Sequence, residues 1–360
     1  MLIISDLKFD LCFSIIVSMK VKLLLFLVIF FCCEALAFSS GKKENDYVEW
    51  FKDVNLEDYA PFHSSRLVAL KGKSTLKLTG NLPILDGATA LFPVYAAFVQ
   101  AVYPKSNYNK VNGKYQFDKG LVRCTTTPNA YESLINGDVN IIFCMEPSKE
   151  QIAKAKGKGL TLKMTAIGKD AFVFIVDTSN PVNNITSGQI RGIYSGKITN
   201  WKELGWEDYN IDAFQRNKGS GSQTLLESIM GDLPIIEPAR RHVFYKMTSL
   251  FTGVAVRASY PPTAIGYSFL YFTTDMVNNN QIKILSIDGI KPSRQTITSG
   301  EYIFSNTFYA ITTGNESDNT KKFINWILSE EGQYLVEKTG YVPIKQTRIS
   351  QYTIFSFQFL

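Results

Sequence analysis

The 360-residue sequence contains only two histidines, His63 and His242, which lie far apart along the chain. A histidine-rich metal centre needs several such side chains together, so we expect neither a metal site nor a cofactor. The chain also lacks a Walker loop and a Gly-x-Ser-x-Gly nucleophile motif. No cluster of His, Cys or carboxylate residues accompanies Ser220, the serine of its sharpest turn motif, so the sequence favours a binding protein over an enzyme.

Charge is also modest. Lys and Arg number 38 against 32 Asp and Glu, the net charge is +6, and charged residues make up 19% of the chain. Because no dense basic stripe accompanies the positive excess, it favours an anionic partner and argues against nucleic acid. Hydrophobic residues make up 45%, which excludes a disordered chain. The length exceeds that of one ordinary core and fits two lobes.

The strongest apolar runs lie at the N-terminus. If translation begins at Met19, a short basic segment, the apolar run Leu23–Phe31 and the small-x-small sequence Ala35-Leu36-Ala37 make up a secretory signal peptide. A membrane anchor is the alternative, but the apolar run is shorter than the roughly 20 residues that a span needs. We therefore predict a signal peptide over residues 1–37 and a secreted mature chain, periplasmic or extracellular.

Only two of the five cysteines, Cys124 and Cys144, follow the predicted cleavage site. In an oxidising compartment they could form a disulfide. If both lie on strands separated by a third strand, their Cα atoms are too far apart for a bridge, and two buried thiols are the simpler interpretation.

The body of the chain alternates short β-branched runs with amphipathic segments, which is typical of an α/β sheet with helices on its faces. Capping boxes at Ser148–Gln151, Thr186–Gln189 and Ser220–Gln223 predict three helix starts. The predicted strands span residues 121–125, 139–144, 160–167, 171–177, 211–215, 264–269, 282–286 and 303–312. Two amphipathic helices over 319–328 and 330–338 follow them. Residues 38–74 are predicted to form a polar N-terminal extension and residues 345–360 an irregular tail.

Three hydroxyl-bearing turns each lie between a predicted strand and a predicted helix: Asp86–Pro93, Cys124–Asn129 and Arg216–Thr224. Free backbone N–H groups at helix starts attract anions, and glycines let a ligand approach the backbone. Arg216 adds a planar fork of donors that suits an oxyanion. Each turn alone is more often a simple helix cap. Together they predict a site for a small tetrahedral or carboxylate anion.

Several segments resemble one known family, the phosphate-binding subunit of bacterial phosphate ABC transporters, a type II periplasmic binding protein. The longest match is Gly196-Lys197-Ile198-Thr199-Asn200-Trp201-Lys202-Glu203-Leu204-Gly205, which resembles the family's "GKITNW-x-E-x-G" signature. Further similar segments are Asn180–Thr186, Phe214–Thr224, Asp86–Tyr95 and Ala264–Tyr267. The resemblance extends from about Thr75 to Ile344.

The resemblance implies an α/β type II periplasmic-binding-protein fold, in which two lobes joined by a two-crossing hinge enclose a ligand cleft. Lobe 1 would comprise residues 75–170 and 267–344, and lobe 2 residues 171–266. The implied ligand is inorganic phosphate or a similar small oxyanion. Position by position, the family's ligand contacts fall on Thr89, the backbone of Ala90, Thr127 or its neighbour Thr126, Arg216, Ser220, Gly221 and Ser222.

One position departs from the family's pattern. Alignment on Pro147 places Met145 where the family has an acidic residue that accepts a proton from bound phosphate, with Glu146 next to it. Because a carboxylate repels a fully deprotonated anion such as sulfate, its absence is expected to weaken discrimination between oxyanions.

Other functions stay open at this level. An ABC permease is the partner that the family implies, and a monomer is the expected state. Alternatives are an exported anion receptor or scavenger without a transporter and an extracellular phosphohydrolase. Asn184 and Asn315 lie in glycosylation sequons, which matter only in a eukaryotic source.

Overall fold

The computed structural model describes residues 54–344, except for 65, 107, 109, 112–113, 239–242, 246–249, 252–253 and 255–262. The described residues belong to one compact unit, Asp53–Leu360. The predicted signal peptide over 1–37, the extension up to residue 53, the tail over 345–360 and His242 lie outside the described residues. None of the described helices has the length and apolarity that crossing a membrane requires.

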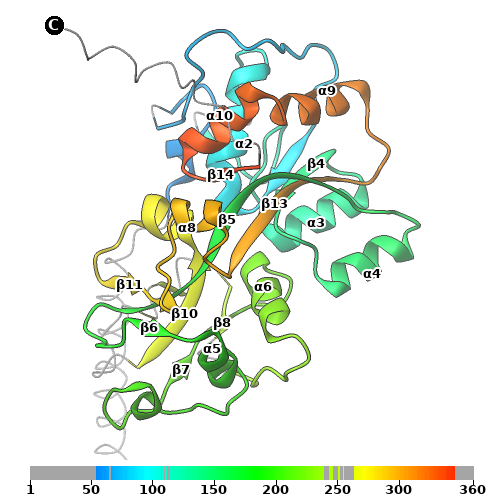
Figure 1. Cartoon of the computed structure of the whole chain (residues 1–360). Helices are drawn as coiled ribbons and strands as arrows, with labels where there is room; N and C mark the ends of the chain where they lie inside the picture. The colour runs from blue at the N-terminus through cyan, green and yellow to red at the C-terminus, as the bar shows by residue number, and fades with distance from the viewer. Residues whose placement is uncertain are drawn as a thin grey trace, which may run out of the picture. The chain divides into compact units, whose positions relative to one another are not determined.

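A mixed eight-stranded sheet organises the molecule (Figure 1). Its strand order is β1-β4-β13-β5-β10-β7, and β11 and β14 also pair with β5. The strands are β1 (Leu85–Gly87), β4 (Ile141–Cys144), β5 (Lys163–Asp177), β7 (Asp212–Ala213), β10 (Ala264–Phe269), β11 (Ile282–Ile284), β13 (Ser305–Thr312) and β14 (Val342–Pro343). The α/β class predicted from the alternating pattern is therefore confirmed.

Strand β5 joins the two halves of this sheet. The sequence predicts two strands, at 160–167 and 171–177, but the structure has one strand of 15 residues. Its first part pairs with β13 and its last part with β10, both antiparallel. Gly168 lies in the predicted gap between the two strands. It instead leaves room for a close neighbour, because a Cβ there would lie 2.4 Å from the Phe308 ring.

Helices cover the sheet and connect its strands (Figure 1). The longer ones are α2 (Phe92–Val102), α3 (Thr127–Asn136), α4 (Lys149–Gly157), α5 (Ser187–Tyr194), α6 (Gly221–Met230), α8 (Arg294–Ser299), α9 (Asp318–Ile327) and α10 (Glu330–Thr339). Reciprocal capping boxes form at Ser148 and Thr186 as predicted, so serine and threonine hydroxyls define the starts of α4 and α5. The two predicted C-terminal helices match α9 and α10 to within one residue at each end.

Short elements complete the described chain. They are η1 (Leu56–Tyr59), η2 (Thr89–Leu91), η3 (Trp201–Leu204), the π-helical turn η5 (Phe272–Val277), β2 (Lys110–Val111), β3 (Lys114–Tyr115), β6 (Asn184–Ile185), β8 (Gln215–Arg216), β9 (Val243–Phe244) and β12 (Ser286–Ile287). The predicted strand 211–215 thus becomes β7 and β8, and 282–286 becomes β11 and β12. Both divisions occur where the chain leaves one sheet for another.

The two cysteines remain apart. The predicted strand 121–125 is reduced to an isolated parallel bridge between Val122 and Leu85 of β1, while Leu85 pairs on its other side with Ile141 of β4. Strand β1 therefore separates the segment of Cys124 from that of Cys144. Both thiols are buried and free, as the simpler interpretation held.

Candidate functional site

A cavity of about 290 Å³ lies where the three hydroxyl-bearing turns meet. All eight residues singled out from the sequence line it, and we call them the polar cup: Thr89, Ala90, Thr126, Thr127, Arg216, Ser220, Gly221 and Ser222. They come from three separate strand-to-helix turns, which precede α2, α3 and α6. The predicted convergence of the turns is therefore present in the fold.

The α6 side of the cup comprises Arg216, Ser220, Gly221 and Ser222. Ser220 caps helix α6 through its side chain, which accepts a 3.4 Å hydrogen bond from the Gln223 N–H. The Ser222 hydroxyl is buried and has no hydrogen-bond partner among the described residues. A buried hydroxyl beside a helix start and a cavity can serve a bound oxygen atom, because a ligand would satisfy it.

Neutral groups hold Arg216 in place. Its Nε donates to the Phe244 carbonyl at 2.8 Å, and its Nη2 donates to the Tyr245 carbonyl at 2.9 Å. Its backbone N–H donates to the Tyr267 hydroxyl and to the Gln223 side chain. Burial lowers the pKa of the guanidinium to about 10, so Arg216 stays charged at neutral pH.

The role of Gln223 differs from the sequence prediction. A full capping box with Ser220 was expected, in which the Gln223 side chain would return to the Ser220 N–H. The Gln223 carbonyl instead accepts from the Arg216 N–H at 3.1 Å and from the Tyr267 hydroxyl. Sequence reasoning missed Tyr267 because it lies 51 residues beyond Arg216 and reaches it only through the sheet.

The β1 side of the cup comprises Thr89, Ala90, Thr126 and Thr127, and a buried carboxylate organises it. Asp86 is fully buried at the centre of β1. Its oxygens accept from the Gly87 N–H at 2.7 Å, the Thr125 N–H at 2.9 Å and the Thr125 hydroxyl at 2.6 Å. Asp86 thereby ties the first turn to the second. Burial raises the pKa of this carboxyl, although the hydrogen bonds from Thr125 oppose the shift.

Thr126 has an unusual backbone. Its φ of 81° and ψ of 160° lie in a region that essentially only glycine adopts. Such a conformation costs a β-branched residue on the order of 1–3 kcal/mol. The strained residue stands at the start of α3 and lines the cavity. Strain of this kind is concentrated at functional sites.

The two sides of the cup already touch at one end. A Cβ at Gly221 would lie 3.4 Å from the Thr127 hydroxyl oxygen and 3.7 Å from the Met145 side chain. Nearby, the Gln151 amide donates to the Gly219 carbonyl at 3.2 Å. The start of α6 therefore lies directly against the starts of α3 and α4.

None of the described residues that line the cavity is Asp or Glu. Met145, which the alignment on Pro147 places at the family's acidic position, is buried with its side chain near Gly221. Its neighbour Glu146 is not among the lining residues, and its carboxylate accepts from the Tyr309 hydroxyl at 3.0 Å. Glu146 does not replace the missing acidic group.

Four apolar residues form a second part of the lining, which we call the apolar wall: Val54, Leu56, Phe269 and Phe272. Val54 and Leu56 belong to the predicted polar extension, where sequence reasoning expected no site residue. No periodic pattern in this stretch marks Val54 or Leu56 as site residues. The side chain of Tyr245 also lines the cavity and is largely exposed.

Chemical groups for catalysis are scarce in the lining. Burial raises the pKa of the Cys124 thiol to about 12, so it is not a thiolate at neutral pH. Within the described ranges, no three His, Cys, Asp or Glu side chains gather where they could hold a metal ion. His63 is exposed, as expected for a surface residue. The lining offers hydrogen-bond donors and one positive charge.

Comparison with known families agrees with this geometry. The model of the PBP superfamily domain matches residues 84–331, which covers both sides of the polar cup. The chain belongs to the PBP superfamily. Val54 and Leu56 lie before the matched PBP domain, so half of the apolar wall comes from outside it.

Similar proteins are phosphate-binding members of this superfamily. The chain is 25% identical over 266 residues to the phosphate-binding protein PstS of Borreliella burgdorferi, covering 72% of this chain and 89% of that protein. In structure it resembles a putative phosphate ABC transporter substrate-binding protein from Clostridium perfringens, solved with bound phosphate. That match has a TM-score of 0.57 and 24% identity and covers 74% of this chain and all of the other.

A second solved structure, an ABC-type phosphate transport receptor from Vibrio cholerae, matches with a TM-score of 0.52 and 21% identity over 72% of this chain and 99% of the other. These likenesses confirm the type II periplasmic-binding-protein fold. The family resemblance inferred from the "GKITNW"-like segment is likewise confirmed.

Proposed function

We propose that this chain is a solute-binding protein that captures inorganic phosphate, or a similar small oxyanion, in the polar cup. One observation carries the proposal: all eight residues on three separate turns line a single cavity. Its relatives carry the name of phosphate-binding proteins. In this proposal the ligand contacts are Thr89, Ala90, Thr126, Thr127, Arg216, Ser220, Gly221 and Ser222.

The chemistry of the cup suits an oxyanion. Hydroxyl groups and backbone N–H groups at helix starts donate hydrogen bonds, and the helix dipoles favour negative charge there. Arg216 supplies the compensating charge, and hydrogen bonds to an ionised acceptor are about twice as strong as neutral ones. Because burial already disfavours the charged guanidinium, an anion beside it would offset that cost.

We infer that binding involves closure of two lobes, residues 75–170 with 267–344 and residues 171–266. Strand β5 runs from one half of the sheet to the other near residue 170, which supports a crossing there. The second predicted crossing falls on β10, near residues 266–269. A ligand that contacts both sides of the cup would favour the closed arrangement.

The biological setting is part of the same proposal. We propose an exported, monomeric binder, periplasmic or extracellular, that serves uptake with an ABC permease. A receptor or scavenger without a permease is the alternative, and genes for a permease and an ATPase beside this one would decide between them. We infer no catalytic role, because among the described lining residues no base lies beside the serines.

Calorimetric titration of the purified chain with phosphate tests the binding proposal. We expect micromolar or tighter binding that is lost in Arg216→Ala and in Ser220→Ala. Arg294→Ala is a matched control, because Arg294 is half exposed and does not line the cavity. Absence of wild-type binding at millimolar phosphate, or equal losses in the control, would overturn the proposal.

A further inference from the structure

The cavity is larger than inorganic phosphate requires. A water molecule takes about 30 Å³ of liquid, so a five-atom oxyanion needs only a few water volumes. The observed cavity of about 290 Å³ is close to the lower limit, about 300 Å³, of pockets for organic ligands. Space therefore remains beside an anion held in the polar cup.

An open arrangement, with the two sides of the cup apart, would also enlarge the cavity, but the two sides are already in contact. Gly221 lies against Thr127 and Met145, and Gln151 already bonds to Gly219 across the same junction. The cup is therefore narrow at its polar end. The apolar wall also lines this cavity, and water beside it would find few hydrogen-bond partners.

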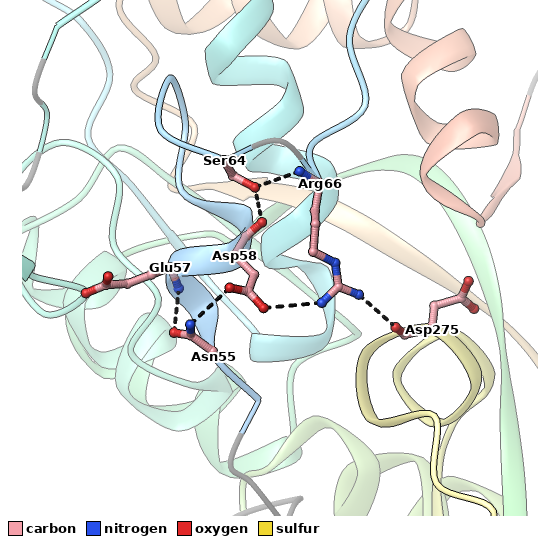
Figure 2. A network of polar contacts seen from close by, with 6 residues as sticks. All are labelled: Asn55, Glu57, Asp58, Ser64, Arg66 and Asp275. Atoms are coloured by element: carbon pink, nitrogen blue, oxygen red, sulfur yellow. Dashed lines mark hydrogen bonds and ion pairs between the residues drawn. The ribbon is translucent and has the colours of Figure 1, made fainter.

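A network of polar contacts, drawn in Figure 2, links the segment that carries Leu56 to η5. Arg66 pairs with the Asp58 carboxylate at 3.3 Å and donates to the Asp275 carbonyl at 3.5 Å. Asn55 donates to Asp58 at 3.0 Å and accepts from the Glu57 N–H at 3.2 Å. These bonds fix η1, which carries Leu56, to η5, which carries Phe272.

The lack of a carboxylate among the described lining residues also favours an anion that carries a substituent. Inorganic phosphate keeps at least one proton at neutral pH, and each P–OH group needs an acceptor in the site. The described lining offers no carboxylate to accept it. A phosphate monoester has its second pKa near 6 and is a dianion without a P–OH group above that pH. Its substituent takes the place of the hydroxyl.

From these two observations we infer that the site prefers phosphate monoesters with a small apolar substituent. The phosphoryl oxygens would occupy the polar cup, and the substituent would contact Val54, Leu56, Phe269 and Phe272. This inference rests on the proposed function, since it uses the same cup for the charged group. The apolar wall would then determine which anion is captured.

Calorimetry at pH 8 with inorganic phosphate, sulfate and n-propyl phosphate tests this inference on the full mature chain. We expect n-propyl phosphate to bind about tenfold or more tightly than inorganic phosphate, because its three carbons leave water. Leu56→Ser and Val54→Ser should reduce this affinity ratio several-fold. Ile303→Ser is a matched control, since Ile303 is 53% exposed and does not line the cavity.

The outcomes separate the two proposals. If phosphate binds and n-propyl phosphate binds no more tightly, the preference for monoesters is wrong and the proposed function stands. If none of the three anions binds, the proposed function fails and this inference fails with it. If the ratio falls equally in Ile303→Ser, the apolar wall is not its source. Because Val54 and Leu56 are only half-buried, their serine variants are expected to fold.

Discussion

The two sides of the polar cup are built on opposite principles. On the α6 side the charge faces the cavity, and neutral groups hold it: two carbonyls, the Tyr267 hydroxyl and the Gln223 amide position Arg216. On the β1 side the groups that face the cavity are neutral, and a buried charge holds them. Asp86 accepts two hydrogen bonds from Thr125 in the threonine turn and a third from the Gly87 N–H, and so orders both turns.

This difference keeps the negative charge of Asp86 out of the cavity while using its acceptors. An exposed carboxylate at the cup would repel an anion, whereas a buried one saturated by donors can shape the loop. The residues that hold the lining in place are therefore as important for the shape of the cup as the residues that face the cavity. Removal of the Asp86 side chain on the β1 side is accordingly expected to reduce stability, and replacement of Arg216 on the α6 side to reduce ligand binding.

The largest effect is expected on the β1 side, from Asp86→Ala. Removing both oxygens leaves the buried Gly87 N–H and the partly buried N–H and hydroxyl of Thr125 without acceptors, at up to about 1–3 kcal/mol each. We expect the free energy of unfolding, measured in urea, to fall by about 3 kcal/mol, with weaker phosphate binding. Asp86→Asn keeps one acceptor oxygen and should lose much less. Equal losses in both variants would remove hydrogen bonding as the cause.

On the α6 side, Arg216→Lys should preserve folding and lose binding. Lysine keeps the charge but cannot donate to the Phe244 and Tyr245 carbonyls while presenting a fork to the ligand. We expect phosphate affinity to fall by about 100-fold, or about 2.7 kcal/mol. Arg294→Lys should change nothing. Unaltered affinity in Arg216→Lys would show that a positive charge alone is sufficient for binding and that the hydrogen bonds to the two carbonyls do not contribute.

A second buried carboxylate sharpens the contrast with Asp86. Asp170 lies in β5 where the halves of the sheet meet, and its Oδ2 has no hydrogen-bond partner among the described residues. Its Oδ1 accepts from the Ala171 and Tyr271 N–H groups. Burial raises its pKa to about 7, with a further rise from Asp275.

The sign of the pH dependence follows from linkage. The unfolded chain ionises this carboxyl near pH 4, whereas the folded chain keeps it protonated to about pH 7. The unfolded state therefore binds fewer protons between these values, and stability falls as the pH rises through them. We expect the free energy of unfolding of the wild-type protein to fall by about 2 kcal/mol between pH 5 and pH 8 because of this group, and Asp170→Asn to abolish that fall. If the melting temperatures of the wild type and of Asp170→Asn changed equally with pH over this range, Asp170 would not be the source of the pH dependence.

Met145 lies between the two sides and offers a test of selectivity. Met145→Asp would place a carboxylate near Gly221, where it can accept the proton of inorganic phosphate and repel sulfate. We expect the ratio of phosphate to sulfate affinity to rise about tenfold, or about 1.4 kcal/mol. Met145→Asn is the neutral control. A ratio that rises equally in both variants would exclude charge as the determinant.

The sequence predicted the residues that line the cavity better than the residues that hold them in position. The three turns were predicted because hydroxyls and glycines at helix starts follow local rules of spacing, and the family resemblance then implied Thr89, Thr127 and Ser220 within them. Tyr267 was not predicted, because contacts between residues 51 positions apart depend on the pairing of strands. Leu56 was missed for a related reason. A short aliphatic segment has no period, and its burial follows from the tertiary anchor of Arg66.

The smallest effect concerns Thr126, the strained residue on the β1 side. Thr126→Gly should relieve about 1–3 kcal/mol of backbone strain, while glycine loses about 0.5–1 kcal/mol more conformational entropy on folding. We expect a net gain in stability of about 1 kcal/mol and weaker phosphate binding, because a hydroxyl is lost. Thr126→Ala removes the same hydroxyl and keeps the strain, so it should weaken binding without stabilising the fold. A gain of similar size in Thr126→Ala would show that the threonine side chain, and not its backbone angle, is what destabilises the turn.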